Sequence, residues 1–103
     1  MHSNDAQMLV LTVLADGPLH GYAINVAIEE LTGRKLGPGS LYGALSRLEA
    51  RGLIAPAGEA VESPERHRTM RITDTGRDTL RAELEQMARV SRAGLRALGS
   101  SPA

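Results

Sequence analysis

Apolar residues gather along the chain in segments of helical length, and turn-forming residues separate these segments. The first segment runs from Asn4 or Asp5, either of which could cap a helix, to Ala15. Its length and its cap favour a helix over a strand, although it is apolar on nearly every side. A helix of this kind needs cover on more than one face. The residues at 16–18, Asp-Gly-Pro, then predict a turn.

Two further helices are predicted before Gly52. One spans Gly21 to Thr32, and its expected inward stripe consists of Ala23, Val26, Ala27 and Leu31. The other begins at Pro38, a residue that suits the first turn of a helix because its missing N–H group would be unpaired there anyway. Its expected inward stripe consists of Leu41, Ala44, Leu45 and Leu48.

Two short strands and a last helix follow. The strands are 53–55 and 69–73, joined by a loop from about Pro56 to Arg66, and in the second strand Met70 and Ile72 alternate with polar residues. Thr73 can cap the last helix. That helix has an apolar stripe at spacings of three and four, made of Leu80, Leu84, Met87, Ser91, Gly94 or Leu95, and Leu98. So small a core cannot cover an apolar stripe of this length, so we expect a second chain to pack against it.

The order of helix, helix, helix, ribbon and helix predicts a winged helix-turn-helix of the mainly α (α+β) class. It would have a three-helix core, a two-stranded wing and a C-terminal dimerisation helix. We expect residues 1–73 to form a DNA-binding domain, 74–98 the dimerisation helix and 99–103 a flexible tail. In this fold the third helix enters the major groove of DNA.

The composition excludes several classes of protein and of functional site. The 103 residues suit one small domain, and the absence of cysteine excludes a disulfide scaffold, a thiolate zinc site and a thiol nucleophile. The aromatic residues are Tyr22 and Tyr42 alone, which argues against a stacking platform for single strands. The longest apolar run is too short to span a membrane, and the N-terminus does not resemble a signal peptide. We therefore expect a cytoplasmic protein with no membrane partner.

The charges balance overall, with 12 Lys and Arg against 12 Asp and Glu, but they are unevenly distributed. Two stretches, 34–51 and 66–77, are locally basic. An anionic partner responds to local potential, so these stretches could bind nucleic acid. Alternatively, the arginines only solvate the surface, and charge alone favours this second interpretation.

The third helix supports the first interpretation. The face opposite its leucines is centred on Gly39, Gly43, Ser46 and Ala50, with Tyr42 and Arg47 beside it. Glycine inside a helix costs about 1 kcal/mol relative to alanine, a cost that folding does not require here. A small outward face would let the backbone approach bases and phosphates closely. The alternative is that Gly43 admits another helix of the protein itself.

The candidate DNA contacts follow from side-chain chemistry. Ser40 could hold a phosphate with the free N–H groups of the first turn, or it could simply cap the helix. Arg47 is suited to a guanine edge, and Lys35 and Arg34 to phosphates. The two tyrosines could donate to phosphate or pack in the core. The full set is Tyr22, Lys35, Gly39, Ser40, Tyr42, Gly43, Ser46, Arg47, Arg66 and Arg68. Three acids in the loop, Glu59, Glu62 and Glu65, weaken the case for a wing that enters the minor groove.

Three motifs together resemble the PadR family of bacterial transcriptional regulators. They are Leu19-His20-Gly21-Tyr22, then 36–42 (Leu-Gly-Pro-Gly-Ser-Leu-Tyr), then 45–54 (Leu-Ser-Arg-Leu-Glu-Ala-Arg-Gly-Leu-Ile), and 71–77 resembles the family's junction between strand and last helix. The resemblance implies a dimeric winged-helix repressor, paired through its first and last helices and relieved in many members by a small effector. The DNA contacts that it implies are Tyr22, Ser40, Tyr42, Arg66 and Arg68. The chain departs from the family at Gly43, where proline is usual, and in having no Phe or Trp.

The sequence therefore predicts a sequence-specific regulator that binds double-stranded DNA as a homodimer on a pseudo-palindromic operator. The expected dimer interface is Leu9, Leu80, Leu84, Met87, Leu95 and Leu98. No enzyme, cofactor or metal is expected, because the histidines are scattered and no phosphate-binding or nucleophile motif is present. The alternative is a winged helix that binds another protein, with its acidic loop facing a basic partner.

Overall fold

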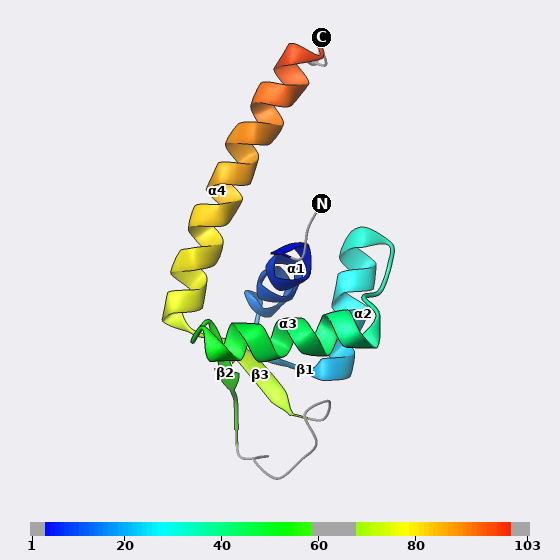
Figure 1. Ribbon diagram of the computed structural model, residues 1–103, viewed down its shortest axis with the longest axis vertical. Helices are drawn as coiled ribbons and strands as arrows, with labels where there is room; N and C mark the ends of the chain where they lie inside the picture. Colours follow the sequence, from blue (N-terminus) through cyan, green and yellow to red (C-terminus); the bar gives the residue numbers. More distant parts are fainter. Residues whose placement is uncertain (1–3, 59–67, 100–103) are drawn as a thin grey trace.

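The computed structural model describes residues 4–58 and 68–99. Three helices, α1 (Asn4–Leu14), α2 (Gly21–Thr32) and α3 (Pro38–Ala50), pack around one apolar core beside a small sheet. A fourth helix, α4 (Asp74–Ala97), begins beside the sheet and rises away from the core, so that its C-terminal end and the sheet lie at opposite ends of the molecule (Figure 1). The molecule is accordingly elongated, 54 Å by 26 Å by 22 Å.

The core is aliphatic. Leucine, isoleucine and valine fill most of it, and the chain contains no phenylalanine or tryptophan. The buried apolar side chains are Val10, Leu11, Leu14, Ile24, Ile28, Leu41, Ala44, Leu45, Leu48, Leu53, Ile54, Met70, Ile72 and Leu80. All four members of the predicted inward stripe of α3 belong to this set, so that prediction is confirmed.

The predicted inward stripe of α2 is wrong by one position. Ile24 and Ile28 are fully buried, whereas Leu31 is exposed. Alanine is too small to fill the space between helices, so the two isoleucines, four residues apart, determine which face of α2 turns inward. Of the other predicted members, Ala23, Val26 and Ala27 are only half-buried.

The sheet has three antiparallel strands in the order β1-β3-β2, where the sequence predicted two. β2 (Ile54–Pro56) and β3 (Thr69–Ile72) form the expected hairpin, and β1 (Leu19–His20) pairs with the other edge of β3. A strand of two residues is too short to show an alternating pattern in the sequence. In β3 the predicted alternation is confirmed, because Met70 and Ile72 are buried while Arg71 is exposed.

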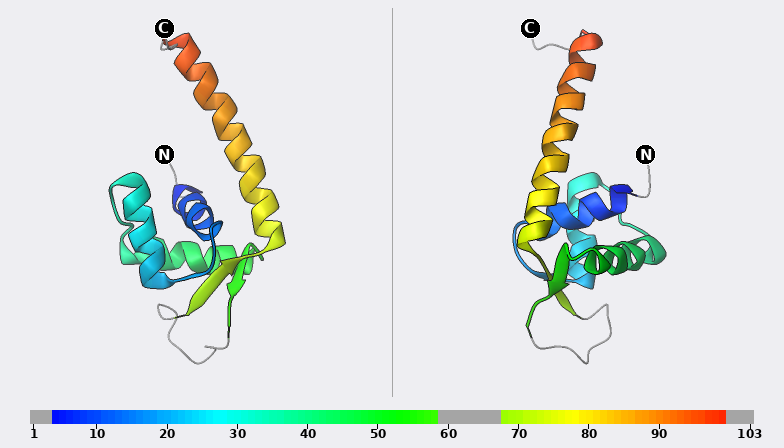
Figure 2. Two further views of the ribbon diagram at one scale, coloured as in Figure 1. Left: turned by 180° about the vertical axis from the view of Figure 1, so that it is seen from behind. Right: turned by 60° about the vertical axis from the view of Figure 1, so that its left-hand side comes forward.

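The junction between β3 and α4 fixes the direction in which α4 leaves the core (Figure 2). The Thr73 hydroxyl accepts a hydrogen bond from the Gly76 N–H group at 3.0 Å, which confirms the predicted cap. The same hydroxyl donates to the Gly52 carbonyl at 2.7 Å, and the Thr73 N–H group donates to the Leu53 carbonyl at 3.0 Å. Gly76 lies so close to this loop that a Cβ atom on it would overlap the Leu53 carbonyl oxygen. The first turn of α4 therefore packs directly on the backbone of the loop at Leu53.

We predict that Gly76→Ala lowers the free energy of unfolding by about 3 kcal/mol, because the added methyl group meets a backbone atom that cannot move aside cheaply. Gly39→Ala is the matched control, since a Cβ atom there meets nothing within 4 Å. Urea unfolding of both variants measures the difference. Equal stability of the two variants would contradict the close approach at Gly76.

Candidate nucleic-acid interface

The flank of α3 opposite its leucines faces outward. Gly39, Ser40, Ser46, Arg47 and Ala50 are exposed, and the neighbouring Tyr42 and Gly43 are half-buried. We call these seven residues the α3 outer face. Glycine, serine and alanine make up most of it, so the backbone of α3 lies close to the molecular surface along its length.

The N-terminal end of α3 is open. Its N-cap is Gly37, and within the described part of the chain no side chain caps this end. The first intrahelical bond runs from the Leu41 N–H group to the Gly37 carbonyl at 2.9 Å. The N–H groups of Gly39 and Ser40 come before it and so lack an intrahelical partner. Ser40 is thus not the cap, and its hydroxyl lies beside two N–H groups that could hold an anion.

Gly43 makes room for the side chain of Arg47. A Cβ atom on Gly43 would lie 3.1 Å from Nη1 of Arg47, and no other neighbour comes within 4 Å of that position apart from the backbone of α3 itself. The Arg47 guanidinium therefore lies back along the α3 outer face. Across the described residues no second helix comes close to Gly43. This glycine therefore does not serve to admit another helix of the protein, which was the alternative.

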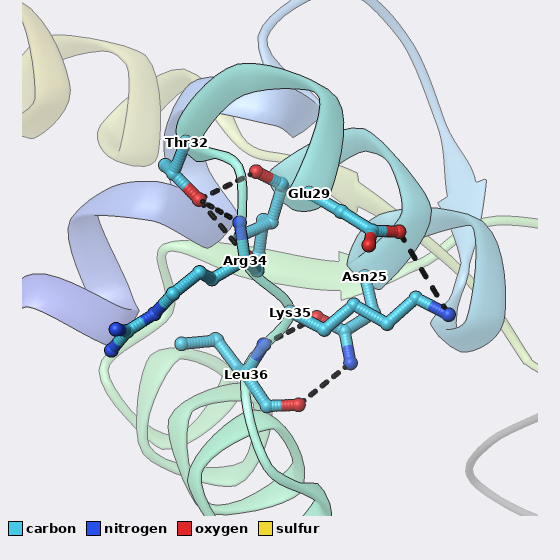
Figure 3. A network of polar contacts seen from close by, with 7 residues as sticks. Asn25, Glu29, Thr32, Arg34, Lys35 and Leu36 are labelled. Atoms are coloured by element: carbon cyan, nitrogen blue, oxygen red, sulfur yellow. Dashed lines mark hydrogen bonds and ion pairs between the residues drawn. The ribbon is translucent and has the colours of Figure 1, made fainter.

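The turn between α2 and α3 is held by the side chain of Asn25. Its Oδ1 accepts from the Leu36 N–H group at 2.9 Å, and its Nδ2 donates to the Leu36 carbonyl at 2.8 Å (Figure 3). Gly33 ends α2 in the left-handed region, with φ of 89°, and lets the chain reverse. The Thr32 hydroxyl accepts from the Arg34 N–H group at 3.2 Å. These bonds fix the residues that lead into α3.

Lys35 and Tyr22 lie together beside this turn. Nζ of Lys35 is 5.6 Å from the centre of the Tyr22 ring and 3.9 Å from Oε1 of Glu29 (Figure 3 shows Lys35 and Glu29). Tyr22 is 65% exposed, so its ring covers no core. Both the ammonium group and the phenol are therefore available at the surface. The pair with Glu29 is long and exposed, which makes it weak.

The basic residues of the hairpin are not equivalent. Arg68, just before β3, pairs with Glu49 of α3, with Nη2 3.4 Å from Oε1. Arg71 projects from the exposed side of β3. Arg66 lies outside the described residues, as do the three loop acids and the predicted tail from position 100 onward. A free cation predicted at position 68 is thus an ion pair in the structure.

The outer part of α4 carries an apolar stripe that nothing in the described chain covers. Leu84, Met87, Leu95 and Leu98 are 40% to 81% exposed, whereas Leu80 is buried in the core of its own chain and Leu9 is half-buried. Val90, 62% exposed, adds to the apolar surface, and the predicted stripe missed it because it continued from Met87 to Ser91, four residues on. A groove of about 400 Å³ opens at the base of this surface, lined by Ala15, Arg77, Leu80, Arg81, Leu84, Glu85 and Ala88.

A family model, that of the transcriptional regulator PadR-like family, matches residues 10–82, which include most of the three-helix core and the sheet. The chain belongs to the PadR-like family. Its members are transcription factors that bind DNA rather than enzymes. The predicted winged-helix fold class is confirmed with it.

Solved structures of transcriptional regulators share the fold of this PadR-like chain. A putative transcriptional regulator from Thermoplasma acidophilum is 27% identical, with a TM-score of 0.71 and coverage of 98% of this chain and 96% of that one. A transcriptional regulator from Clostridium thermocellum is 26% identical, with a TM-score of 0.74 and coverage of 88% and 87%. A PadR family transcription regulator from Clostridium difficile shares the fold at 22% identity, with a TM-score of 0.73 and coverage of 90% and 97%.

A sequence relative is longer than this PadR-like chain. An uncharacterized 37.1 kDa protein in transposon TN4556 of Streptomyces fradiae is 58% identical over 91 residues. The match covers 88% of this chain, which spans 25% of the length of that relative. Separately, no helix among the described residues of this chain is long and apolar enough to cross a membrane.

Asn25 and Glu49 make contacts at the two ends of the candidate interface that no sequence pattern predicted. We predict that Asn25→Ala lowers the free energy of unfolding by about 1–2 kcal/mol, because the Leu36 N–H and carbonyl groups lose their partners together. The Leu36 amide should also exchange with solvent much faster than in the wild type. Glu30→Ala, at an exposed position of the same helix, serves as the control. Unchanged protection of Leu36 would contradict the role of Asn25.

Proposed function

We propose that this PadR-like protein is a sequence-specific repressor that binds a pseudo-palindromic operator as a homodimer. The observation that carries the proposal is the α3 outer face. Most of its side chains are small and exposed, and no described side chain caps the N-terminal end of the helix. The family supplies the general activity of DNA-binding regulation.

The α3 outer face fits the major groove by size. An α-helix with its side chains is about 10–12 Å across, and the groove is about 12 Å wide. Glycine, serine and alanine on the leading face let α3 enter more deeply than larger residues would. The N–H groups of Gly39 and Ser40 would then bind a backbone phosphate, with the Ser40 hydroxyl beside them.

Arg47 is the residue that we propose to read a base. Its guanidinium lies over Gly43, in the middle of the α3 outer face, and its two donors match the N7 and O6 acceptors of guanine. Tyr22 and Lys35 flank this face and Tyr42 belongs to it, and we propose that all three contact phosphates. Arg68 is left out of these contacts because Glu49 already pairs with it.

The exposed stripe of α4 is the proposed dimer interface, together with Leu9 of α1. Leu84, Met87, Leu95 and Leu98 form it, and Leu80 is left out because its own chain already buries it. Apolar residues spaced three and four apart on a helix are typical of a surface that packs on a second helix. A twofold dimer would present its two α3 helices about 34 Å apart, one turn of DNA.

Repression and its relief complete the proposal. A dimer seated on an operator excludes other proteins from that stretch of DNA. The groove between α4 and the end of α1 combines apolar side chains with Arg77 and Arg81, and we propose it as the place where a small effector would act on the dimer. A ligand there would touch α4 and so change the spacing of the two α3 helices.

Selection of bound duplexes from a random pool tests the proposed function. We expect enrichment of a two-part symmetric site whose half-sites are centred about 10 base pairs apart, or a multiple of that. Binding to the selected duplex should weaken steeply as salt is raised, because several phosphates are contacted. No enrichment, or an interaction that salt does not change, would point to the protein-binding alternative.

We predict that Arg47→Ala relaxes sequence preference at one base position of each half-site, by about 1–3 kcal/mol. Arg47→Lys should lose most of the same preference, since an ammonium group lacks the paired donors, while keeping the charge. Binding titrations on the selected duplex and on single-base variants measure both. Equal weakening on every sequence would instead make Arg47 a phosphate contact.

We predict that Leu84→Glu dissociates the dimer, because the new carboxylate would be buried without a partner. Ala82→Glu is the control, since Ala82 is exposed on the same helix but lies off the apolar stripe. Analytical ultracentrifugation of the two variants should give a monomer for the first and a dimer for the second. An unchanged dimer with Leu84→Glu would remove α4 from the interface.

A further inference from the structure

We propose that Arg68 and Glu49 form a latch that fastens the base of the wing hairpin to the C-terminal end of α3. In this role Arg68 is a positioning residue, not the phosphate contact that its charge and the family resemblance suggest. The inference rests on the proposed function for its consequence in DNA binding, and the latch itself is testable without DNA.

The geometry holds the Arg68 side chain partly buried against the protein. Nη2 is 3.4 Å from Oε1 of Glu49, and the two side chains are 22% and 36% exposed. Nε of Arg68 is buried and has no hydrogen-bond partner within the described part of the chain. A side chain that served to reach a phosphate would keep its donors in solvent. Here Nε of Arg68 is shielded from solvent, and the guanidinium lies beside the Glu49 carboxylate.

Glu49 needs a cation at its position. It lies in the last turn of α3, where the partial negative charge of the helix terminus disfavours a carboxylate. Arg47 and Arg51 are two residues away on either side, so neither shares its face of the helix. Arg47 lies over Gly43, and Nη1 of Arg51 donates to Oε1 of Gln7 in α1 at 2.5 Å. Of the described cations, Arg68 is the one paired with Glu49.

The pair joins two parts of the interface that must meet one duplex together. The last described bond of the hairpin ladder runs from the Ala57 N–H group to the Thr69 carbonyl at 2.7 Å. Arg68 is the residue next to Thr69 on the loop side, so the latch acts where the wing departs from the sheet. Because the pair is neutral as a whole, it adds little attraction for phosphate. What it supplies is a fixed relation between the wing and α3.

Hydrogen exchange tests the latch without DNA. The Ala57 amide, which closes the base of the wing, should exchange at least several-fold faster in Glu49→Gln and in Arg68→Ala than in the wild type. The amides of α1 should stay unchanged, which shows that the variants fold. Arg71→Ala is the matched control, since it removes a hairpin charge that is exposed, and it should leave Ala57 protected. Protection of Ala57 that neither variant changes would overturn the latch.

Binding to the selected duplex tests its consequence. Glu49→Gln and Arg68→Ala should each weaken binding by about threefold to tenfold, the double variant should be no weaker than either single one, and the salt dependence should stay as in the wild type. The opposite pattern would overturn the positioning role. In that pattern Glu49→Gln binds the duplex more tightly, and the salt dependence of binding by Arg68→Ala falls by about one phosphate contact. Arg68 would then be a phosphate contact that Glu49 restrains. If the wild type binds no duplex, the proposed function fails while the exchange result still decides the latch.

Discussion

The one-sided burial of α3 is the constraint on which the interface depends. Leu41, Leu45 and Leu48 pack into the core, so the residues opposite them must face solvent. Burial of a leucine side chain contributes about 1.5–3 kcal/mol, and turning α3 about its axis would expose all three. That cost, on the order of 5–9 kcal/mol, is comparable to the whole stability of a small domain. The direction of the α3 outer face is therefore set by the core.

Polar contacts at the two ends of α3 complement this burial. Asn25 holds Leu36 just before the helix begins. At the opposite end, Glu49 of α3 pairs with Arg68 of the hairpin, and Arg51, just after α3, donates to Gln7 of α1. Within the described part of the chain, no other element covers Gly43 in the middle of the helix. This arrangement restrains α3 at its ends and leaves its centre open, which suits the base-reading role that we propose for it.

The elements that were predicted well are those in which a local pattern decides the structure. The stripe of α3, the alternation in β3 and the cap at Thr73 each depend on neighbours a few residues apart. The stripe of α2 was wrong because small and large apolar residues occur on adjacent faces, and only the packing of Ile24 and Ile28 against the other helices distinguishes them. β1 was missed because its two residues become a strand only by pairing with β3.

The outward direction of the α3 flank was predicted from the sequence, but the internal contacts of the candidate site were not. Arg68 and Glu49 are 19 residues apart, and Asn25 and Leu36 are 11 apart, so no sequence periodicity connects them. Its charge made Arg68 resemble a phosphate ligand. The partner that neutralises it becomes visible only when the hairpin folds back on α3.

Mapping which surface of the protein meets DNA tests the proposed role of α3 most directly. The chain contains no cysteine, so Ala50→Cys gives a single site on the α3 outer face for an iron chelate that cleaves nearby DNA. Ala93→Cys, exposed on the distal half of α4 but off its apolar stripe, gives the reference. We expect strand cleavage from position 50, at two places separated by one helical turn and staggered as in the major groove, and none from position 93. Cleavage from position 93 alone would contradict the proposed role of α3.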